Sequence, residues 1–251
     1  MKGFKVLFTT ELKLSLRSPD AILFSLLMPV LVLVVIALIY GPAGSADGQS
    51  SMIEQTFGAF IAIGICAIGL MGLPLVLAEY RHKKVLKRLQ VTPVHPGLLL
   101  GVQFAVQTLM ALLSAALVIT VAFVFFGLRL EGPPWAIAAA YLLVLVSIFS
   151  IGLLIASTAK DIKQAGIICS ILYFPMLLFS GTTIPIHVFP QPLQTAAGIL
   201  PLRQGIILLN GVSNGDSFAL FGPQIAVLLL IAVVATLASI FTFRWDMDSA
   251  H

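Results

Sequence analysis

The sequence predicts an all-α polytopic membrane protein with six transmembrane helices, and three observations lead to that fold class. Hydrophobic residues make up 59% and charged residues only 10% of the 251-residue chain, whereas a soluble domain carries about 25% charged residues. Several long stretches contain no Asp, Glu, Lys or Arg, and about 20 apolar residues suffice to cross a bilayer as a helix. Lys and Arg gather in alternate connecting segments, which is typical of repeated crossings. We expect a single domain over residues 1–251.

The N-terminal segment, residues 1–20, has the pattern of an amphipathic helix that lies on the membrane surface. Its apolar residues recur at helical spacing. This apolar face consists of Phe4, Leu7, Phe8, Leu12 and Leu16. The opposite face is basic and carries Lys2, Lys5, Lys13 and Arg17. Such a helix lies in the headgroup layer, and a simple positively charged leader remains the alternative. Ser18, Pro19 and Asp20 then interrupt the pattern before the first apolar stretch.

Six apolar stretches define the expected spans. They cover residues 21–40, 57–78, 98–126, 134–158, 165–181 and 222–243. Pro29 and Pro74 fall inside the first two spans, where we expect kinks, because proline removes a backbone donor and membrane helices tolerate this when neighbours compensate. Residues 21–243 therefore form a six-span bundle, and residues 244–251 form a short cytoplasmic tail.

The distribution of basic residues predicts the orientation of these spans. Twelve of the 14 Lys and Arg residues fall in the N-terminal segment, after the second and fourth spans, and in the tail. Only Arg129 and Arg203 are left for the other side. Because cytoplasmic segments carry the excess of Lys and Arg, we expect both termini in the cytoplasm and the chain in the plasma (inner) membrane. The net charge of +4 then reflects topology, and we expect no nucleic-acid partner.

A basic cytoplasmic segment connects the second and third spans. Residues 78–97 read AEYRHKKVLKRLQVTPVHPG. Val85, Leu86 and Leu89 form a short apolar stripe on an otherwise charged helix, which Thr92 and Pro93 terminate. A rigid helix at this place is suited to transmit movement between spans. A solvated basic loop that binds anionic lipid is the alternative, and the pattern favours neither.

The segment between the fifth and sixth spans is too apolar for an exposed loop and too interrupted for a span. Its prolines are Pro185, Pro190, Pro192 and Pro201. Two short helices that re-enter the outer leaflet satisfy both properties, because irregular backbone at membrane depth must be covered by protein or water. A disordered linker, the alternative, is expected to have a more polar composition.

Spans two and five carry residue types expected along a transport path. Span two places Gly58, Gly69 and Gly72 on one helical face, where backbones can approach closely. Span five offers adaptable aromatic and thioether side chains without charge. These are Tyr173, Phe174, Met176 and Phe179. Packing between helices of the same chain explains the glycines at least as well. If these residues line a path, its substrate is amphipathic or lipid-like.

These features together resemble the ABC-2 type permease family, the membrane subunits of many bacterial drug, antibiotic and polysaccharide exporters. The most specific part is residues 151–204, IGLLIASTAKDIKQAGIICSILYFPMLLFSGTTIPIHVFPQPLQTAAGILPLRQ. Residues at family-like positions include Phe174-Pro175-Met176, Ser180-Gly181, Pro185, Pro190, Leu193-Gln194 and Pro201-Leu202. The segment EYRHKKVLKRLQVTP is similar to the family's cytoplasmic coupling helix. It has Lys84 and Lys87 where many members have glycine and glutamate.

The resemblance implies the permease subunit of an ATP-binding-cassette exporter, which is not itself an enzyme. Two such subunits, identical or related, pair in the bilayer with two ATPase subunits that hold ATP and Mg²⁺, so no cofactor is expected in this chain. The implied ATPase-coupling residues are Glu79, Tyr80, Arg81, Val85, Leu86, Leu89, Thr92 and Pro93. Spans two and five line the implied substrate path. The implied external gate contains Pro185, Pro190, Gln194 and Pro201. The expected cargo is a drug, antibiotic, lipopeptide or glycolipid.

Other function classes find less support in the residues. Proton-coupled transporters carry ionisable residues in their spans, and the six spans contain no Asp, Glu, Lys, Arg or His. Sodium coupling through hydroxyls and carbonyls stays open. No two histidines have metal-ligand spacing, so we expect neither a metal site nor an enzyme. A membrane anchor does not explain the basic or the proline-rich segment. The sequence has no GxxxxGK(S/T) motif, so we expect ATP hydrolysis on another chain.

Overall fold

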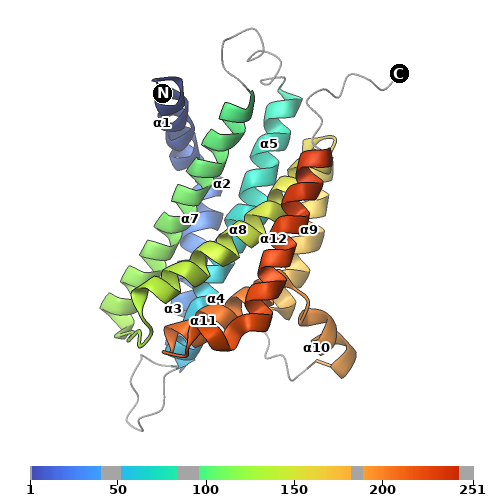
Figure 1. Cartoon of the computed structure of the whole chain (residues 1–251). Coiled ribbons are helices and arrows are strands. Elements are labelled where there is room, and N and C mark those ends of the chain that lie inside the picture. Colours follow the sequence, from blue (N-terminus) through green and yellow to red (C-terminus); the bar gives the residue numbers. More distant parts are fainter. Residues whose placement is uncertain (1, 41–51, 84–95, 182–188, 243–251) are drawn as a thin grey trace.

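Every element in the described part of the chain is a helix (Figure 1). A computed structural model describes residues 2–40, 52–83, 96–181 and 189–242. The all-α class predicted from composition is therefore confirmed. The predicted coupling stripe after His82, the gate residue Pro185 and the tail 244–251 lie outside the described residues.

The helices follow the order of the apolar stretches. After α1 (Lys2–Arg17), the first stretch forms α2 (Pro19–Ile22), a π-helical turn (Leu23–Leu27) and α3 (Met28–Tyr40). The second stretch forms α4 (Met52–Ala67), another π-helical turn (Ile68–Gly72) and α5 (Leu73–His82). Three long helices follow: α7 (Pro96–Phe126), α8 (Pro134–Thr158) and α9 (Ile162–Phe179). The last elements are α10 (Gln191–Ala197), α11 (Pro201–Ser213), a 3-10 turn (Phe218–Phe221) and α12 (Gly222–Thr242).

Five helical stretches are long and apolar enough to cross a membrane. They are Ile53–His82, Leu98–Phe126, Pro134–Thr158, Ile162–Phe179 and Phe218–Thr242. The first expected span contributes a shorter apolar helix, Ser25–Ile39. The described chain begins and ends at the same end of the bundle (Figure 1), as an even number of crossings requires. The chain is thus a multi-pass membrane protein, and the count of six spans remains a prediction.

Both π-helical turns precede a proline by the same distance. Leu23–Leu27 ends two residues before Pro29, and Ile68–Gly72 ends two residues before Pro74. Proline lacks the N–H that a helix interior uses, and its ring crowds the preceding turn. A single widened turn accommodates this local irregularity within a continuing helix. The disturbance expected at these prolines therefore takes the form of a π turn in each span.

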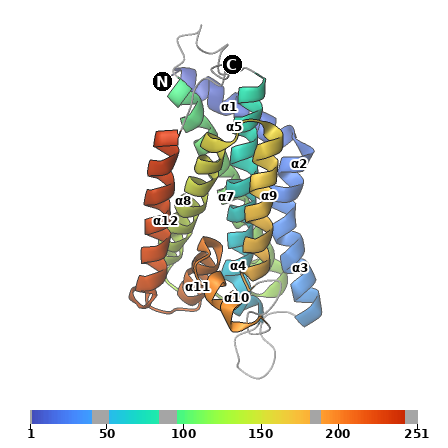
Figure 2. The same cartoon turned by 90° about the vertical axis from the view of Figure 1, so that its right-hand side faces the viewer.

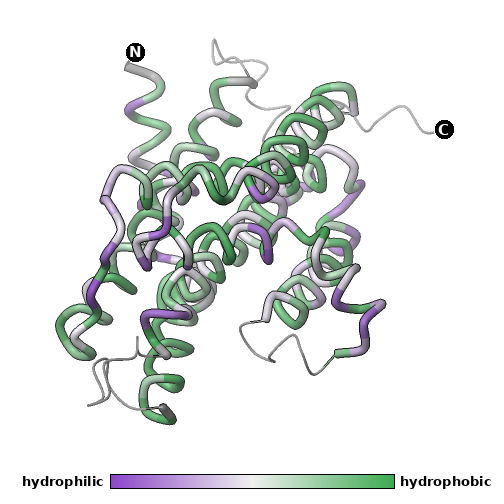
Figure 3. Tube along the Cα trace, turned by 60° about the horizontal axis from the view of Figure 1, so that its bottom comes forward, coloured by the Kyte–Doolittle hydropathy of each residue, from purple (hydrophilic) through white to green (hydrophobic). Residues whose placement is uncertain are grey.

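The second span is the central helix of the bundle. Residues 57–70 are all buried, and α3, α7, α8, α9 and α11 pack around α4, the first part of this span. The surrounding helices turn apolar side chains outward. Examples are Leu38 of α3 and Phe125 of α7, whose side chains are 77% and 72% exposed. Most of the helical length is hydrophobic (Figure 3), as contact with lipid requires.

The helix α11 lies at the end of the bundle opposite α1 (Figures 1 and 2). The Gly58 N–H of α4 donates a hydrogen bond of 2.7 Å to the Asn210 side-chain oxygen of α11. On α8, Val144 lies so near Gly205 of α11 that an added Cβ would come within 2.8 Å of its methyl groups. The short helices α10 and α11 occupy the segment where two were predicted, and their depth in a bilayer remains a prediction.

We expect Gly152→Ala to lower the thermal stability of the detergent-solubilised protein. A Cβ at Gly152 would lie 2.0 Å from the Gly69 carbonyl oxygen, so α8 and the second span must separate; overpacking of this kind costs about 1–3 kcal/mol. Gly101→Ala is the matched control, because a Cβ there meets nothing within 4 Å and alanine favours a helix. Unfolding midpoints from intrinsic fluorescence test this expectation. Equal midpoints for the two variants would contradict it.

Candidate functional site

The last turn of α5 carries the three predicted coupling residues that the structure describes, Glu79, Tyr80 and Arg81. This turn lies at the same end of the bundle as α1 (Figure 1). The other predicted members lie outside the described residues, namely Val85, Leu86, Leu89, Thr92 and Pro93. Lys83 ends the helix, with its Nζ 2.6 Å from Glu79 Oε1. Because this pair is exposed, it stabilises the helix by only about 0.3–0.5 kcal/mol.

Arg81 connects the second span to the turn between α8 and α9. Its Nη1 donates a hydrogen bond of 2.9 Å to the Ala159 carbonyl oxygen. Ala159 is the C-cap of α8, where unpaired carbonyls and the helix dipole favour a positive charge. The turn is ordered by its own bonds. Asp161 accepts from the Gln164 N–H at 2.7 Å, and the Gln164 side chain accepts from the Lys160 N–H at 2.8 Å.

Tyr80 connects the second span to α1 and α7. Its hydroxyl donates to a carboxylate oxygen of Glu11. The Gln103 amide donates to the same oxygen at 2.7 Å and to the Tyr80 hydroxyl at 3.0 Å. Gln103 is 1% exposed, and the other two residues are half-buried. We call Glu11, Tyr80 and Gln103 the basal cluster.

No motif in the sequence predicts Glu11 or Gln103, although each carries a signal. Glu11 lies on the same side of α1 as Leu7 and Phe8, which are half-buried, so it is an acidic residue in an apolar face. Gln103 is one of a few polar residues in a mostly apolar span. A polar group in such surroundings needs a hydrogen-bonding partner. The pattern indicates that partners exist but does not identify them.

The glycines predicted along the substrate path all face other helices of this chain. Gly58 meets α11, as described above. A Cβ added to Gly69 would lie 2.8 Å from the side chains of Ile148 and Phe149 on α8, and one added to Gly72 would lie 3.2 Å from the Gln107 side chain on α7. These glycines therefore serve packing within the chain. A role of span two in the path remains a prediction.

The four path residues predicted in span five lie on different sides of α9. Met176 is buried, Tyr173 and Phe179 are half-buried, and Phe174 is 56% exposed. Of the four, Phe174 is the one that faces away from the bundle. It belongs to an outward apolar stripe on α9, which consists of Ile167, Ile171, Phe174 and Leu178.

Two of the predicted gate prolines begin the short helices. Pro190 is the N-cap of α10, and Pro201 is the first residue of α11, where the missing N–H has no intrahelical partner to lose. The Gln194 amide donates to the Phe189 carbonyl oxygen at 2.8 Å, which holds the start of α10. Pro185 lies outside the described residues. Both short helices lie at the end of the bundle opposite the basal cluster (Figure 2).

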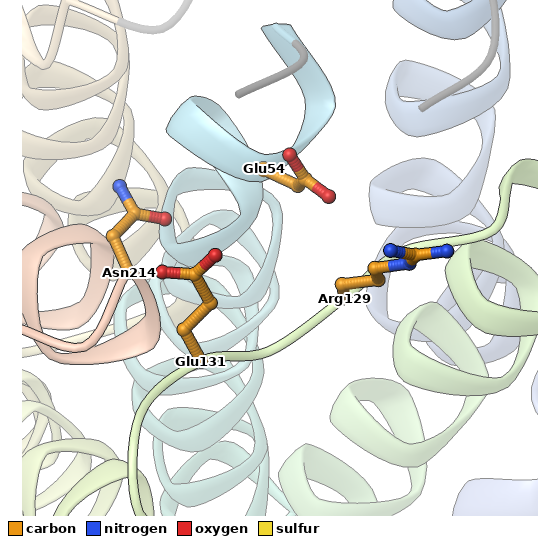
Figure 4. Close-up of a pocket in the computed structure, with 4 residues that line it drawn as sticks. All are labelled: Glu54, Arg129, Glu131 and Asn214. Atoms are coloured by element: carbon orange, nitrogen blue, oxygen red, sulfur yellow. The ribbon is translucent and has the colours of Figure 1, made fainter. Parts of the chain in front are cut away.

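A small polar pocket, drawn in Figure 4, lies beside the end of α11, which is at the end of the bundle opposite α1 (Figure 1). It is lined by Glu54, Arg129, Glu131 and Asn214. These residues come from the first turn of α4, the connection between α7 and α8, and the end of α11. The Glu131 and Gly132 N–H groups donate to the Ser213 carbonyl oxygen at 3.1 and 3.2 Å, which ties two of these segments together. The pocket is lined by both acidic and basic side chains, which suit a polar group of a ligand. No sequence motif predicts this pocket.

The described residues do not bring together a metal-binding set. Within these ranges, no three His, Cys, Asp or Glu side chains are placed to hold an ion. Cys66 and Cys169 are buried in the apolar core, where a thiol packs as a small apolar group. The two polar sites described above, the basal cluster and the polar pocket, lie at opposite ends of this apolar bundle.

Comparison with protein families supports the resemblance to ABC-2 type permeases described above. The family model described as ABC-2 type transporter matches residues 2–212. The matched region includes α1, the basal cluster, the central span and nearly all of α11. Comparison with curated proteins gave no match. Because the family match extends over far more than half of the sequence, the chain belongs to the ABC-2 type transporter family.

Proposed function

We propose that this chain is the permease subunit of an ATP-binding-cassette exporter whose ATP is hydrolysed by a separate partner subunit. Family membership over residues 2–212 carries the proposal. The sequence has no GxxxxGK(S/T) motif, the P-loop that holds nucleotide phosphates. In this proposal the chain provides the transport path and is not an enzyme. ATP and Mg²⁺ bind on the partner.

The end of the bundle that carries the basal cluster faces the cytoplasm and the ATPase. Basic residues support this orientation, because they are enriched on the cytoplasmic side of membrane proteins. Those described at this end are Lys5, Lys13, Arg17, Arg81, Lys83, Lys160 and Lys163. Arg129 and Arg203 lie toward the other end. Both termini are then cytoplasmic, and the membrane is the plasma (inner) membrane.

The ATPase docks on the segment that follows α5, which acts as the coupling helix. The connections of the preceding turn support this role. Arg81 bonds to the turn between α8 and α9, and Tyr80 bonds to α1. A force applied to the chain after His82 therefore reaches several helices at once, which a free loop would not achieve.

A second permease subunit, identical or related, completes the membrane part. The outward apolar stripe of α9 supports this pairing because it presents Phe174 from a helix of the predicted path. Between the two subunits, an uncharged lining suits an amphipathic or lipid-like substrate such as a drug, antibiotic, lipopeptide or glycolipid. The short helices α10 and α11, with Pro185, Pro190, Gln194 and Pro201, form the external gate in this arrangement.

Cysteine labelling in intact cells tests the orientation. We expect a membrane-impermeant thiol reagent to modify a Ser45→Cys variant but not a Ser249→Cys variant, because the positive-inside rule places residue 45 outside and residue 249 inside. The parent chain is the control for its own cysteines, which are buried. The reverse labelling pattern would overturn the orientation.

Nucleotide hydrolysis tests the division of labour between subunits. We expect the purified chain to hydrolyse no ATP, since it lacks a P-loop, and the complex that it forms when co-expressed with its P-loop partner to be active. A complex whose ATPase carries a P-loop Lys→Ala substitution is the control. Hydrolysis by this chain alone, free of contaminating ATPase, would refute the proposal.

The test of the coupling segment is Leu86→Asp, which places a negative charge in the predicted apolar stripe. Apolar side chains at the centre of an interface dominate affinity, while rim charges mainly tune encounter. We therefore expect Leu86→Asp to reduce recovery of the tagged ATPase in a pull-down, or efflux of a fluorescent amphipathic dye, far more than Lys83→Ala does. Normal recovery and efflux for Leu86→Asp, with loss only when the basic residues are neutralised together, would favour a lipid-binding loop instead.

A further inference from the structure

The basal cluster joins three helices that are distant in the sequence. Glu11 belongs to α1, Tyr80 to α5 and Gln103 to α7. Tyr80 is 69 residues and Gln103 is 92 residues from Glu11. The hydroxyl and the amide converge on one carboxylate oxygen, and the amide also donates to the hydroxyl. Each of the three side chains is therefore bonded to both of the others.

The Glu11 carboxylate is held by these hydrogen bonds to Tyr80 and Gln103. Within the described ranges, Glu11 forms no salt bridge. Hydrogen bonds to an ionised carboxylate are shorter and stronger than those between neutral groups. The burial of Gln103 also limits competition from water. Loss of one member leaves the others with unmet hydrogen bonds at a partly buried place, which is unfavourable, so the three residues act as a unit.

The basal cluster lies next to a second connection of the same helical turn. Arg81 directly follows Tyr80, and its guanidinium bonds to Ala159 at the end of α8. The last turn of α5 is therefore held by α1 and α7 through Tyr80 and by the α8–α9 turn through Arg81. In addition, α1 packs along α7, with Leu7 and Phe8 half-buried. Movement of α1 relative to α5 requires the basal cluster to break.

We propose that Glu11, Tyr80 and Gln103 are positioning residues that couple the interfacial helix to the second and third spans during transport. They hold α1, α5 and α7 together, so that displacement of α1 by the ATPase subunit moves both spans with it. This inference rests on the proposed function, because it requires an ATPase at this face of the bundle. It assigns the coupling to a three-residue hydrogen-bonded contact in addition to the predicted coupling segment.

The test measures amide hydrogen exchange in the complete complex with its ATPase, both nucleotide-free and trapped with ATP and vanadate. In the parent complex, we expect trapping to change exchange in α1 (Lys2–Arg17) and in α5 (Leu73–His82). In Tyr80→Phe and in Gln103→Leu, we expect the α1 response to persist and the α5 response to fall by at least about twofold. Both variants keep the approximate side-chain volume, so nucleotide-free exchange should differ from the parent only next to the substituted residue.

Two substitutions at Glu11 separate hydrogen bonding from side-chain removal. Glu11→Gln keeps an oxygen that can accept both bonds, so we expect a response close to the parent. Glu11→Ala removes the acceptor, so we expect it to behave like Tyr80→Phe. Tyr141→Phe is the matched control, because the Tyr141 hydroxyl is buried in α8 without a hydrogen-bonding partner among the described residues. Its loss should leave both responses unchanged.

A parent-like α5 response in both Tyr80→Phe and Gln103→Leu would overturn the inference. A general rise of nucleotide-free exchange in α1, α5 and α7 would also overturn it, because the basal cluster would then only stabilise the fold. A parent chain that recovers no ATPase, or whose complex does not respond to trapping, would instead reject the proposed function and this inference with it. The parent and variant measurements therefore distinguish the two failures.

Discussion

The backbones of the second span and α8 approach so closely that a Cβ on Gly152 would lie 2.0 Å from the Gly69 carbonyl oxygen. Much of the bundle depends on such approaches, because lipid is as apolar as a helix surface and helices associate mainly through packing. Gly58 likewise allows α11 to pack closely against the second span, and Gly72 leaves space for the Gln107 side chain of α7. The second span can therefore be surrounded by neighbours while the outer helices meet lipid.

Hydrogen bonds between side chains add direction to this packing. Thr236 donates to Ser150 at 3.0 Å, which joins α12 to α8. At the cytoplasmic end of the proposed orientation, Tyr80 and Arg81 bond to groups on different sides of one helical turn. Apolar contacts tolerate small displacements of one helix along another, whereas hydrogen bonds require a defined geometry. The end of the second span is consequently more tightly specified than its apolar length.

Apolar length predicted the order of the helices better than their limits. The second span was expected over residues 57–78, but the helix continues to His82 because backbone hydrogen bonding does not stop at the first charged side chain. Glu79 and Arg81 are thus part of the same rigid helix as the buried glycines. Pro29 and Pro74 were expected to disturb their spans, and a π turn precedes each of them. The prolines predict where each span is disturbed, and the structure shows that the disturbance is a single π turn.

The sequence by itself determined the fold class, the succession of apolar helices and the family, because hydrophobic length, charge placement and local motifs are properties of continuous segments. It also assigned Glu79, Tyr80 and Arg81 to the basic segment after the second span, and the structure includes them in the last turn of that helix. Only the tertiary structure decided that Tyr80 bonds to Glu11 and Gln103, since these residues are 69 and 23 positions away from it. The tertiary structure also determines that the glycines of span two face neighbouring helices of the same chain. Which side chains meet depends on how helices rotate and approach one another, and that is set by packing over the whole bundle.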